Sequence, residues 1–133
     1  MLSKIRRTTT TAGEMMDITD DVADIVAKAE VKDGIVVIYS LHTTCGVRVN
    51  ENTDPELKND IVNALSAIFP PQHPWYTHKG GNAGAHIKAT VVGESATIII
   101  ENWKMKLGRW QAIYLCEFDG PRDREFLVKV MAG

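Results

Sequence analysis

The feature that most constrains the fold is the run GIVVIYSLH, residues 34–42, which is rich in β-branched residues and almost entirely apolar. A strand with one face in water alternates apolar and polar side chains, and this run does not. It therefore predicts a strand in the interior of a sheet, buried on both faces.

Two other segments predict amphipathic helices. In residues 17–34, apolar side chains recur at helical spacing after a cluster of acidic residues. In residues 52–71, Thr53 and Glu56 fit a capping box and Pro55 fits the first helical turn. We expect a short amphipathic helix in the first segment and a longer one in the second.

The remaining segments are mostly strands. A third helix is expected after Asn82, although residues 87–92 would also suit a strand. Strands are expected at residues 4–11, 46–51, 95–103, 110–118 and 124–132. Because helices and strands are segregated along the chain, the predicted class is α+β, with a mainly antiparallel, sandwich-like sheet and two or three helices in one domain, residues 1–133.

Composition limits the kinds of partner. A net charge of −2 gives no electrostatic basis for binding nucleic acid or an anionic membrane. No apolar run is long enough to span a bilayer, and the first residues lack the apolar core of a signal peptide. The two cysteines, Cys45 and Cys116, do not form a disulfide framework, so we expect a cytoplasmic protein.

Three of the four histidines lie at element ends or in the loop before a helix. His42 ends the apolar strand, His78 lies in a Gly-rich loop and His86 lies in the first turn of the short helix. Three protein ligands with one open position form the usual catalytic zinc site. The spacing is irregular, so three unrelated surface or core histidines are the alternative.

The corner that follows His42 also has two interpretations. Cys45 is either a nucleophile or metal ligand, or, as is commoner, a small buried side chain. Thr43 and Thr44 either fix the turn or position a substrate.

Charged residues at strand ends are further candidates. Glu51 and Glu117 could act as a general base or orient an imidazole, or simply be solvated. Arg122 could clamp an anion, or pair within its own turn. Free N–H groups after Asn82 would suit a phosphate.

Three blocks of the sequence together resemble the YjbQ-like family, whose members are described as uncharacterised proteins and also as secondary thiamine-phosphate synthases. The blocks are HTTCGVRVNENTDPELKNDI (42–61), YTHKGGNAGAHIKATVVG (76–93) and LGRWQAIYLCEFDGPRDR (107–124). They occur in the family's order, and the resemblance extends from Lys4 onward.

The resemblance implies that these blocks meet in one pocket. It nominates His42, His78 and His86 as ligands of a divalent metal, zinc by its ligand set. The other residues that it implies are Glu51, Glu117 and Arg122 for catalysis, and Thr43, Thr44, Asn82 and Trp110 for substrate binding.

The resemblance also implies a homotrimer with the pocket near a subunit boundary and a small phosphorylated substrate. The nominal activity is that of a thiamine-phosphate synthase-like transferase, which joins a pyrimidine methyl diphosphate to a thiazole phosphate. Two other functions stay open: a trimer that binds a metal or metabolite without catalysis, and a metal-dependent hydrolase of a small phosphate or ester.

Overall fold

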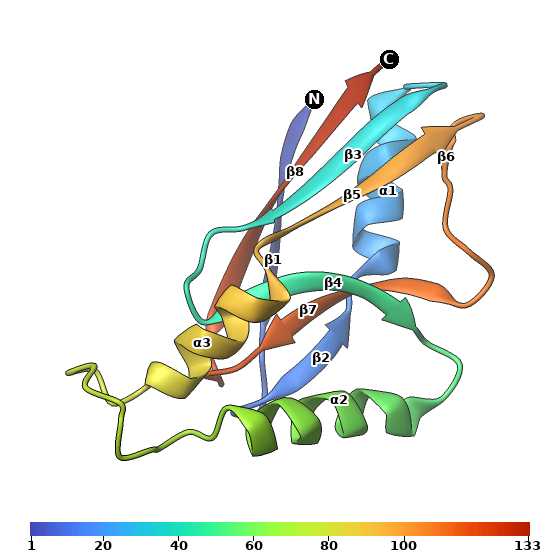
Figure 1. The fold of residues 1–133 in the computed structure, drawn as a ribbon. Coiled ribbons are helices and arrows are strands. Elements are labelled where there is room, and N and C mark those ends of the chain that lie inside the picture. The colour runs from blue at the N-terminus through green and yellow to red at the C-terminus, as the bar shows by residue number, and fades with distance from the viewer.

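The computed structural model describes residues 1–133 and contains three helices and two antiparallel sheets (Figure 1). The helices are α1 (Thr19–Ala29), α2 (Pro55–Ile68) and α3 (Ala83–Val92). The strands are β1 (Leu2–Thr8), β2 (Glu14–Asp17), β3 (Gly34–Ser40), β4 (Cys45–Glu51), β5 (Ser95–Glu101), β6 (Lys104–Met105), β7 (Gln111–Glu117) and β8 (Asp123–Ala132). The larger sheet has the order β1-β8-β3-β5-β6 and the smaller sheet the order β2-β7-β4. The predicted α+β class with mainly antiparallel strands is confirmed.

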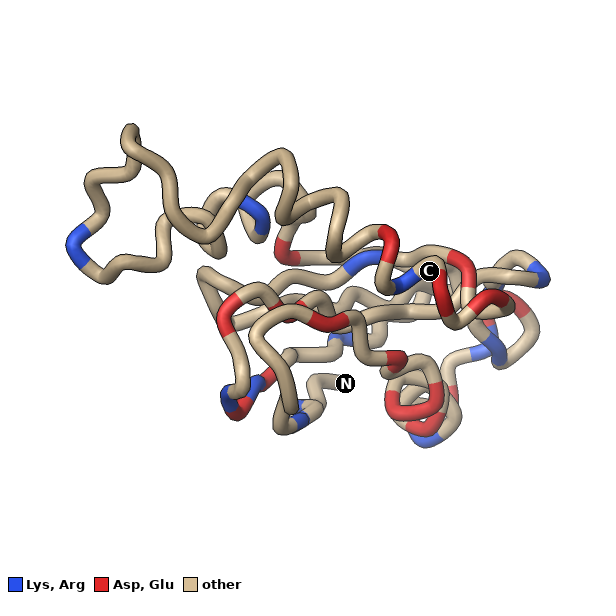
Figure 2. Tube along the Cα trace, turned by 90° about the horizontal axis from the view of Figure 1, so that it is seen from below, with Lys and Arg blue, Asp and Glu red and all other residues tan.

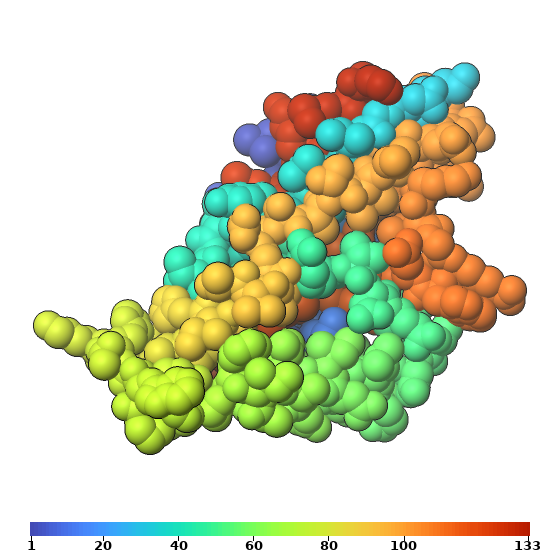
Figure 3. Space-filling model, in the orientation of Figure 1, coloured from blue at the N-terminus to red at the C-terminus, as the bar shows by residue number.

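The apolar run at residues 34–42 forms β3, in the middle of the larger sheet between β8 and β5. Its interior position is therefore confirmed, but its burial on both faces is not found in one chain. Val36 and Ile38 are fully buried, whereas Tyr39 on the opposite face is 45% exposed. The difference arises because α1 packs on the inner face only, and no helix lies on the outer face (Figure 3).

Two layers of core hold the sheets and helices together. The main core joins the inner face of the larger sheet to α1 and to β4 and β7 of the smaller sheet, and Phe126, Val22 and Leu115 represent these three parts. A second cluster covers the other face of the smaller sheet, where Ala85 and Ala89 of α3 pack near Tyr114. The smaller sheet is thus buried on both sides, and its middle strand β7 is almost wholly inaccessible from Ala112 onward.

Local details differ from the sequence expectations in three places, and one open alternative is decided. Strands β2 and β6 were not predicted, because β2 is a short methionine-containing segment and β6 has two residues. Residues 87–92 are helical, since the small side chains of α3 let it lie against the smaller sheet. The N-cap of α2 is Asp54, whose carboxylate accepts the Glu56 N–H at 2.9 Å, so the proposed Thr53–Glu56 capping box is wrong.

The loop between α2 and α3 projects from the body of the molecule (Figures 1 and 3). Basic and acidic residues are interspersed along the chain trace rather than gathered by sign (Figure 2). None of the three helices combines the length and the apolar character needed to cross a bilayer.

Candidate functional site

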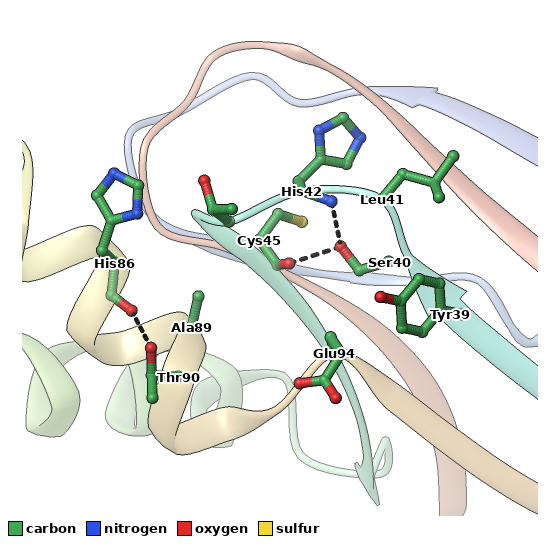
Figure 4. A pocket seen from close by; sticks show the side chains of 10 residues that line it. Tyr39, Ser40, Leu41, His42, Cys45, His86, Ala89, Thr90 and Glu94 are labelled. Atoms are coloured by element: carbon green, nitrogen blue, oxygen red, sulfur yellow. Dashed lines mark hydrogen bonds between the residues drawn. The ribbon is translucent and has the colours of Figure 1, made fainter.

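The corner between β3 and β4 opens onto a hollow that we call the corner hollow. One part, of about 490 Å³, lies between the end of β3 and α3; another, of about 300 Å³, extends toward the segment after β7. Both parts are lined by Leu41, His42, Thr43 and His86, so they form one continuous hollow. Figure 4 shows the first part, with His42 on the corner and His86 on α3.

The corner is held by the last side chain of β3. Ser40 Oγ donates to the Cys45 carbonyl at 2.7 Å and accepts the His42 N–H at 3.2 Å (Figure 4). One hydroxyl thus fixes both ends of the turn. Thr44 is buried within the turn, whereas Thr43 is exposed to the hollow.

His42 is fixed by a bond from a different strand. Its Nε2 accepts the backbone N–H of Glu125 at 2.8 Å. Burial, reinforced by the positive charge of Arg124, lowers the pKa of His42. The ring is therefore neutral at pH 7 with its proton on Nδ1, and it offers the hollow a hydrogen-bond donor rather than a free lone pair.

Glu117 and Arg124 form a buried ion pair beneath the hollow. Arg124 Nε donates to Glu117 Oε1 at 2.8 Å, and Arg124 Nη2 contacts Oε2. Thr9 Oγ1 and the N–H of Asp119 also donate to this carboxylate, while Arg124 Nη2 donates to Thr44 Oγ1 at 2.9 Å.

This network decides what Glu117 can do. Burial alone would raise its pKa, but the Arg124 guanidinium and the N–H and hydroxyl donors outweigh burial and lower it. The Glu117 side chain is fully inaccessible, so in one chain it positions Arg124 and Thr44 rather than reaching a substrate.

The segment after β7 supplies the other charged residues of the hollow. Asp119 Oδ2 accepts from Asn82 Nδ2 at 2.8 Å and from Arg122 Nη2 at 3.0 Å. Arg122 Nε also donates to the Asp119 carbonyl at 2.7 Å. The guanidinium of Arg122 is thus paired within its own turn, which is one of the two roles that the sequence suggested for it. Arg122 is nevertheless exposed and lines the hollow.

His78 and His86 form a close pair at the edge of the hollow. Their ring centroids are 4.9 Å apart and the rings meet edge to face. A Cβ at Gly80 would lie 2.9 Å from His78 Nε2 and 3.0 Å from Asn82 Oδ1. Asn82 Oδ1 is buried and accepts no hydrogen bond from the chain. Two potential ligand atoms, His78 Nε2 and Asn82 Oδ1, therefore flank the space beside Gly80, which has no side chain. The imidazole of His86 lies next to that of His78.

In one chain the three predicted histidines do not form a ready metal site. No group of three or more His, Cys, Asp or Glu side chains in the chain is arranged to hold a metal ion. His42 lines the same hollow as His86, but its Nε2 is engaged by Glu125. A pair of imidazoles with an oxygen donor is nevertheless a set that zinc and related metals accept.

Two further candidate residues, Glu51 and Trp110, lie away from the corner hollow within one chain. Strand β4 begins at the corner and ends at Glu51, so Glu51 is about 20 Å along the strand from the corner. The carbonyl of Trp110 accepts the Asn52 N–H at 3.0 Å, which places Trp110 near Glu51 and away from the histidines. Neither Glu51 nor Trp110 lines the corner hollow.

Cys45 is 1% exposed, although it borders the first part of the hollow. Burial raises the pKa of its thiol far above the ordinary range. Cys116 is buried as well, and burial raises its pKa to about 12. Both cysteines are free and behave as small core side chains.

Sequence reasoning missed Arg124 and Ser40. Arg124 precedes Phe126, Val128 and Val130 on the buried face of β8. A charged residue in phase with a buried apolar face requires a partner, and this signal would have identified it. Ser40 carries no comparable signal, because its role depends on the shape of the turn.

Comparison with known proteins agrees with the fold and with the sequence blocks. The sequence profile of the family described as "UPF0047 protein YjbQ-like" matches residues 3–133. A UPF0047 protein of Methanocaldococcus jannaschii is 49% identical over 98% of this chain and 94% of its own length. The UPF0047 protein YugU of Bacillus subtilis is 41% identical over 98% of this chain and 99% of its own length.

Solved structures give the same result. An uncharacterised YjbQ/UPF0047 protein of Clostridium acetobutylicum superposes with a TM-score of 0.94 at 45% identity, covering 97% of this chain and 99% of the other. A YbjQ-like protein of unknown function from Sulfolobus solfataricus superposes with a TM-score of 0.95 at 32% identity, covering 100% and 97%. The chain therefore belongs to the YjbQ-like UPF0047 family.

Proposed function

We propose that the corner hollow binds a small phosphorylated metabolite. The observation that carries the proposal is the convergence of His42, His86 and Arg122, from three separate segments, on one hollow. His42 offers an N–H, Arg122 an exposed guanidinium and Thr43 a hydroxyl. Such donors suit the oxygens of a phosphate, and arginine is well matched to that geometry.

We further propose that His78, His86 and Asn82 hold a divalent metal, zinc by its preference for imidazole, beside the phosphate group. When bound, the metal would neutralise negative charge on phosphoryl oxygens. The support is the close imidazole pair together with the unpartnered oxygen of Asn82. In this proposal His42 contacts the substrate and does not bind the metal.

The reaction that fits these residues is a transfer of the thiamine-phosphate synthase type. A pyrimidine methyl diphosphate loses pyrophosphate as its methylene C–O bond breaks, and the ring nitrogen of a thiazole phosphate forms the new C–N bond with its lone pair. Arg122 and the Nδ1–H of His42 would stabilise the negative charge that develops on the leaving pyrophosphate. Because the attacking nitrogen carries no proton, the step needs no general base.

The state of the carboxylates favours this transfer over hydrolysis that uses a carboxylate as general base, which would need a free carboxylate in the hollow. Hydrolysis by a metal-bound water would need no such base and stays the alternative reaction. Glu117 is buried in its ion pair, and Asp119 is shared by Asn82 and Arg122. A protein that binds the metabolite without converting it would have the same hollow, so turnover is the measurement that separates these functions.

The binding proposal is tested by titrating pyrophosphate and measuring heat or ³¹P chemical shifts. Arg122→Gln should weaken binding by roughly tenfold or more, because a charge-assisted contact is lost. Arg109→Gln is the matched control, since the Arg109 guanidinium lies over the Trp110 ring, outside the hollow. Equal affinities of wild type and Arg122→Gln would refute the proposal.

The metal proposal has a separate readout. Metal content after purification without chelators should fall in His78→Ala and in His86→Ala. His73→Ala serves as control, because His73 lies in the same loop but packs against Trp75, 4.3 Å away between ring centroids. Metal retained in both variants, or lost equally in the control, would contradict the assignment.

A further inference from the structure

A second cavity, of about 200 Å³, lies between α2, α3 and the loop after β1. Asn82 and Asp119 line both this cavity and the corner hollow, so the hydrogen bond between them forms part of the wall that separates the two. Ala12, Pro71 and Gly81 at its edge are exposed, which leaves the cavity open to solvent. The function proposed above makes no use of it.

The cavity contains a buried lysine without a counter-charge. Lys88 of α3 is 4% exposed. Its Nζ donates one hydrogen bond, to Ser66 Oγ at 3.2 Å, and lies 5.8 Å from the centroid of the Phe118 ring. It takes part in none of the ion pairs of the chain. An ammonium has three N–H donors, so most of its capacity is unmatched.

The only other charged side chain at the cavity does not balance this lysine. Asp119 is an acid, but its Oδ2 already accepts from Arg122 and Asn82. A buried ammonium without a compensating anion is unfavourable, and an anion that reached it would meet a strong, partly desolvated attraction. The cavity is therefore arranged for a negative ligand group.

We propose that this cavity is a binding site for a small aliphatic carboxylate, with Lys88 and Ser66 holding the carboxylate oxygens. The apolar side chains of Val62, Ala85 and Phe118 also line the cavity and suit a short hydrocarbon body. The volume is well above what one water molecule requires, and it accommodates an anion of a few heavy atoms. A phosphate would leave several oxygens facing these apolar walls, so the carboxylate is the better match.

The test is a titration with propionate, followed by amide chemical shifts in ¹H–¹⁵N NMR spectra. In wild type, the amides of Ser66, Gly81 and Lys88 should shift and saturate. Propionamide, which has the same shape without the charge, should bind roughly tenfold more weakly or worse. Lys88→Met should abolish the saturating shifts, and Lys88→Gln is the second variant should the first fail to fold.

Two controls separate this site from the corner hollow. In Arg122→Gln the saturating propionate shifts should stay on Ser66, Gly81 and Lys88, although the loss of one Asp119 partner changes the affinity, and inorganic phosphate should not displace propionate from the wild type. The proposal is overturned if propionate still saturates the same amides in Lys88→Met. It is equally overturned if the shifts in wild type fall on residues 41–44 and disappear in Arg122→Gln, because the anion would then occupy the corner hollow.

Discussion

At the scale of single residues, the Glu117–Arg124 pair is the charged interaction on which the site depends most. It joins the end of β7 to β8, and through Thr44 it also fixes the corner that carries His42. Removing one partner of a buried pair leaves an uncompensated charge in a place that water cannot reach. The pair is therefore best understood as a positioning device for the hollow above it.

Glu117→Ala should lower the free energy of unfolding by about 3–5 kcal/mol, because Arg124 would remain buried without its carboxylate. Urea denaturation followed by circular dichroism measures this loss. Glu101→Ala is the control, since Glu101 pairs with Lys106 on the exposed surface and its loss should have no measurable effect. Equal stabilities of the two variants would show that the buried pair contributes little.

The same carboxylate predicts a pH dependence. Its folded-state pKa lies below the ordinary value of 4.5, so Glu117 contributes stability that is fully present above pH 4.5. That contribution is lost as the pH falls from 4.5 through the folded-state pKa. Unfolding of wild type and Glu117→Gln across this acidic range should show the stability difference narrowing; a constant difference would contradict the lowered pKa.

The buried thiols give another prediction at this scale. Because burial raises the pKa of Cys45, the native protein should react very slowly with iodoacetamide at pH 8, and both cysteines should react once it is unfolded. Mass spectrometry counts the modified thiols.

Cys45→Ser should also keep most of any measurable activity; a loss as large as that in His42→Ala would identify Cys45 as essential.

At the scale of elements, α2 is held less firmly than the other helices. None of its residues is fully buried, although Ile61, Val62 and Leu65 pack on the second core cluster. A helix with a partly covered apolar face depends more on its ends. The Asp54 cap therefore matters for α2, whose Val62 and Ser66 line the cavity that holds Lys88.

Asp54→Ala should destabilise α2 by about 1 kcal/mol, because the Glu56 N–H loses its acceptor. Hydrogen exchange of the α2 amides should accelerate accordingly. Thr53→Ala tests the alternative capping residue and should leave these rates unchanged. A larger effect at Thr53 than at Asp54 would restore the capping box that the sequence first suggested.

At the scale of the whole molecule, the outer face of the larger sheet is an uncovered surface that carries apolar side chains. Atoms of β8, β3 and β5 form the visible surface there (Figure 3). Tyr39, Ile99 and Met131 are 45%, 62% and 40% exposed, and they come from the three adjacent strands. Contiguous apolar surface of this kind is typical of protein interfaces.

We propose that this face is covered by copies of the same chain in a homotrimer, the state that the family resemblance implies. Light scattering should then give the mass of a trimer for the wild type and of a monomer for Ile99→Lys, with unchanged circular dichroism. Ile68→Lys, at the end of α2, introduces the same charge at a site that is 67% exposed and should remain trimeric. A wild-type protein that is monomeric at micromolar concentration would refute the proposal.

The sequence by itself determined the elements whose signals are local. The uninterrupted apolar run identified β3 as an interior strand, and helical periodicity located α1 and α2, because each pattern is carried by neighbours in the chain. The same reasoning failed for β2 and left residues 87–92 open between a helix and a strand. In those segments, pairing with β7 and packing of small side chains on the smaller sheet outweigh weak local preferences.

Only the tertiary structure decided how the polar residues are used. The sequence nominated His42, Glu117 and Arg122, but it could not show that the Glu125 N–H occupies His42 Nε2 or that Glu117 is fully buried. The partners concerned are remote: Thr9 and Glu117 are 108 positions apart, and Asn82 and Asp119 are 37 apart. The chemistry of an ionisable group depends on its burial and on the groups that touch it, and both are properties of the folded chain.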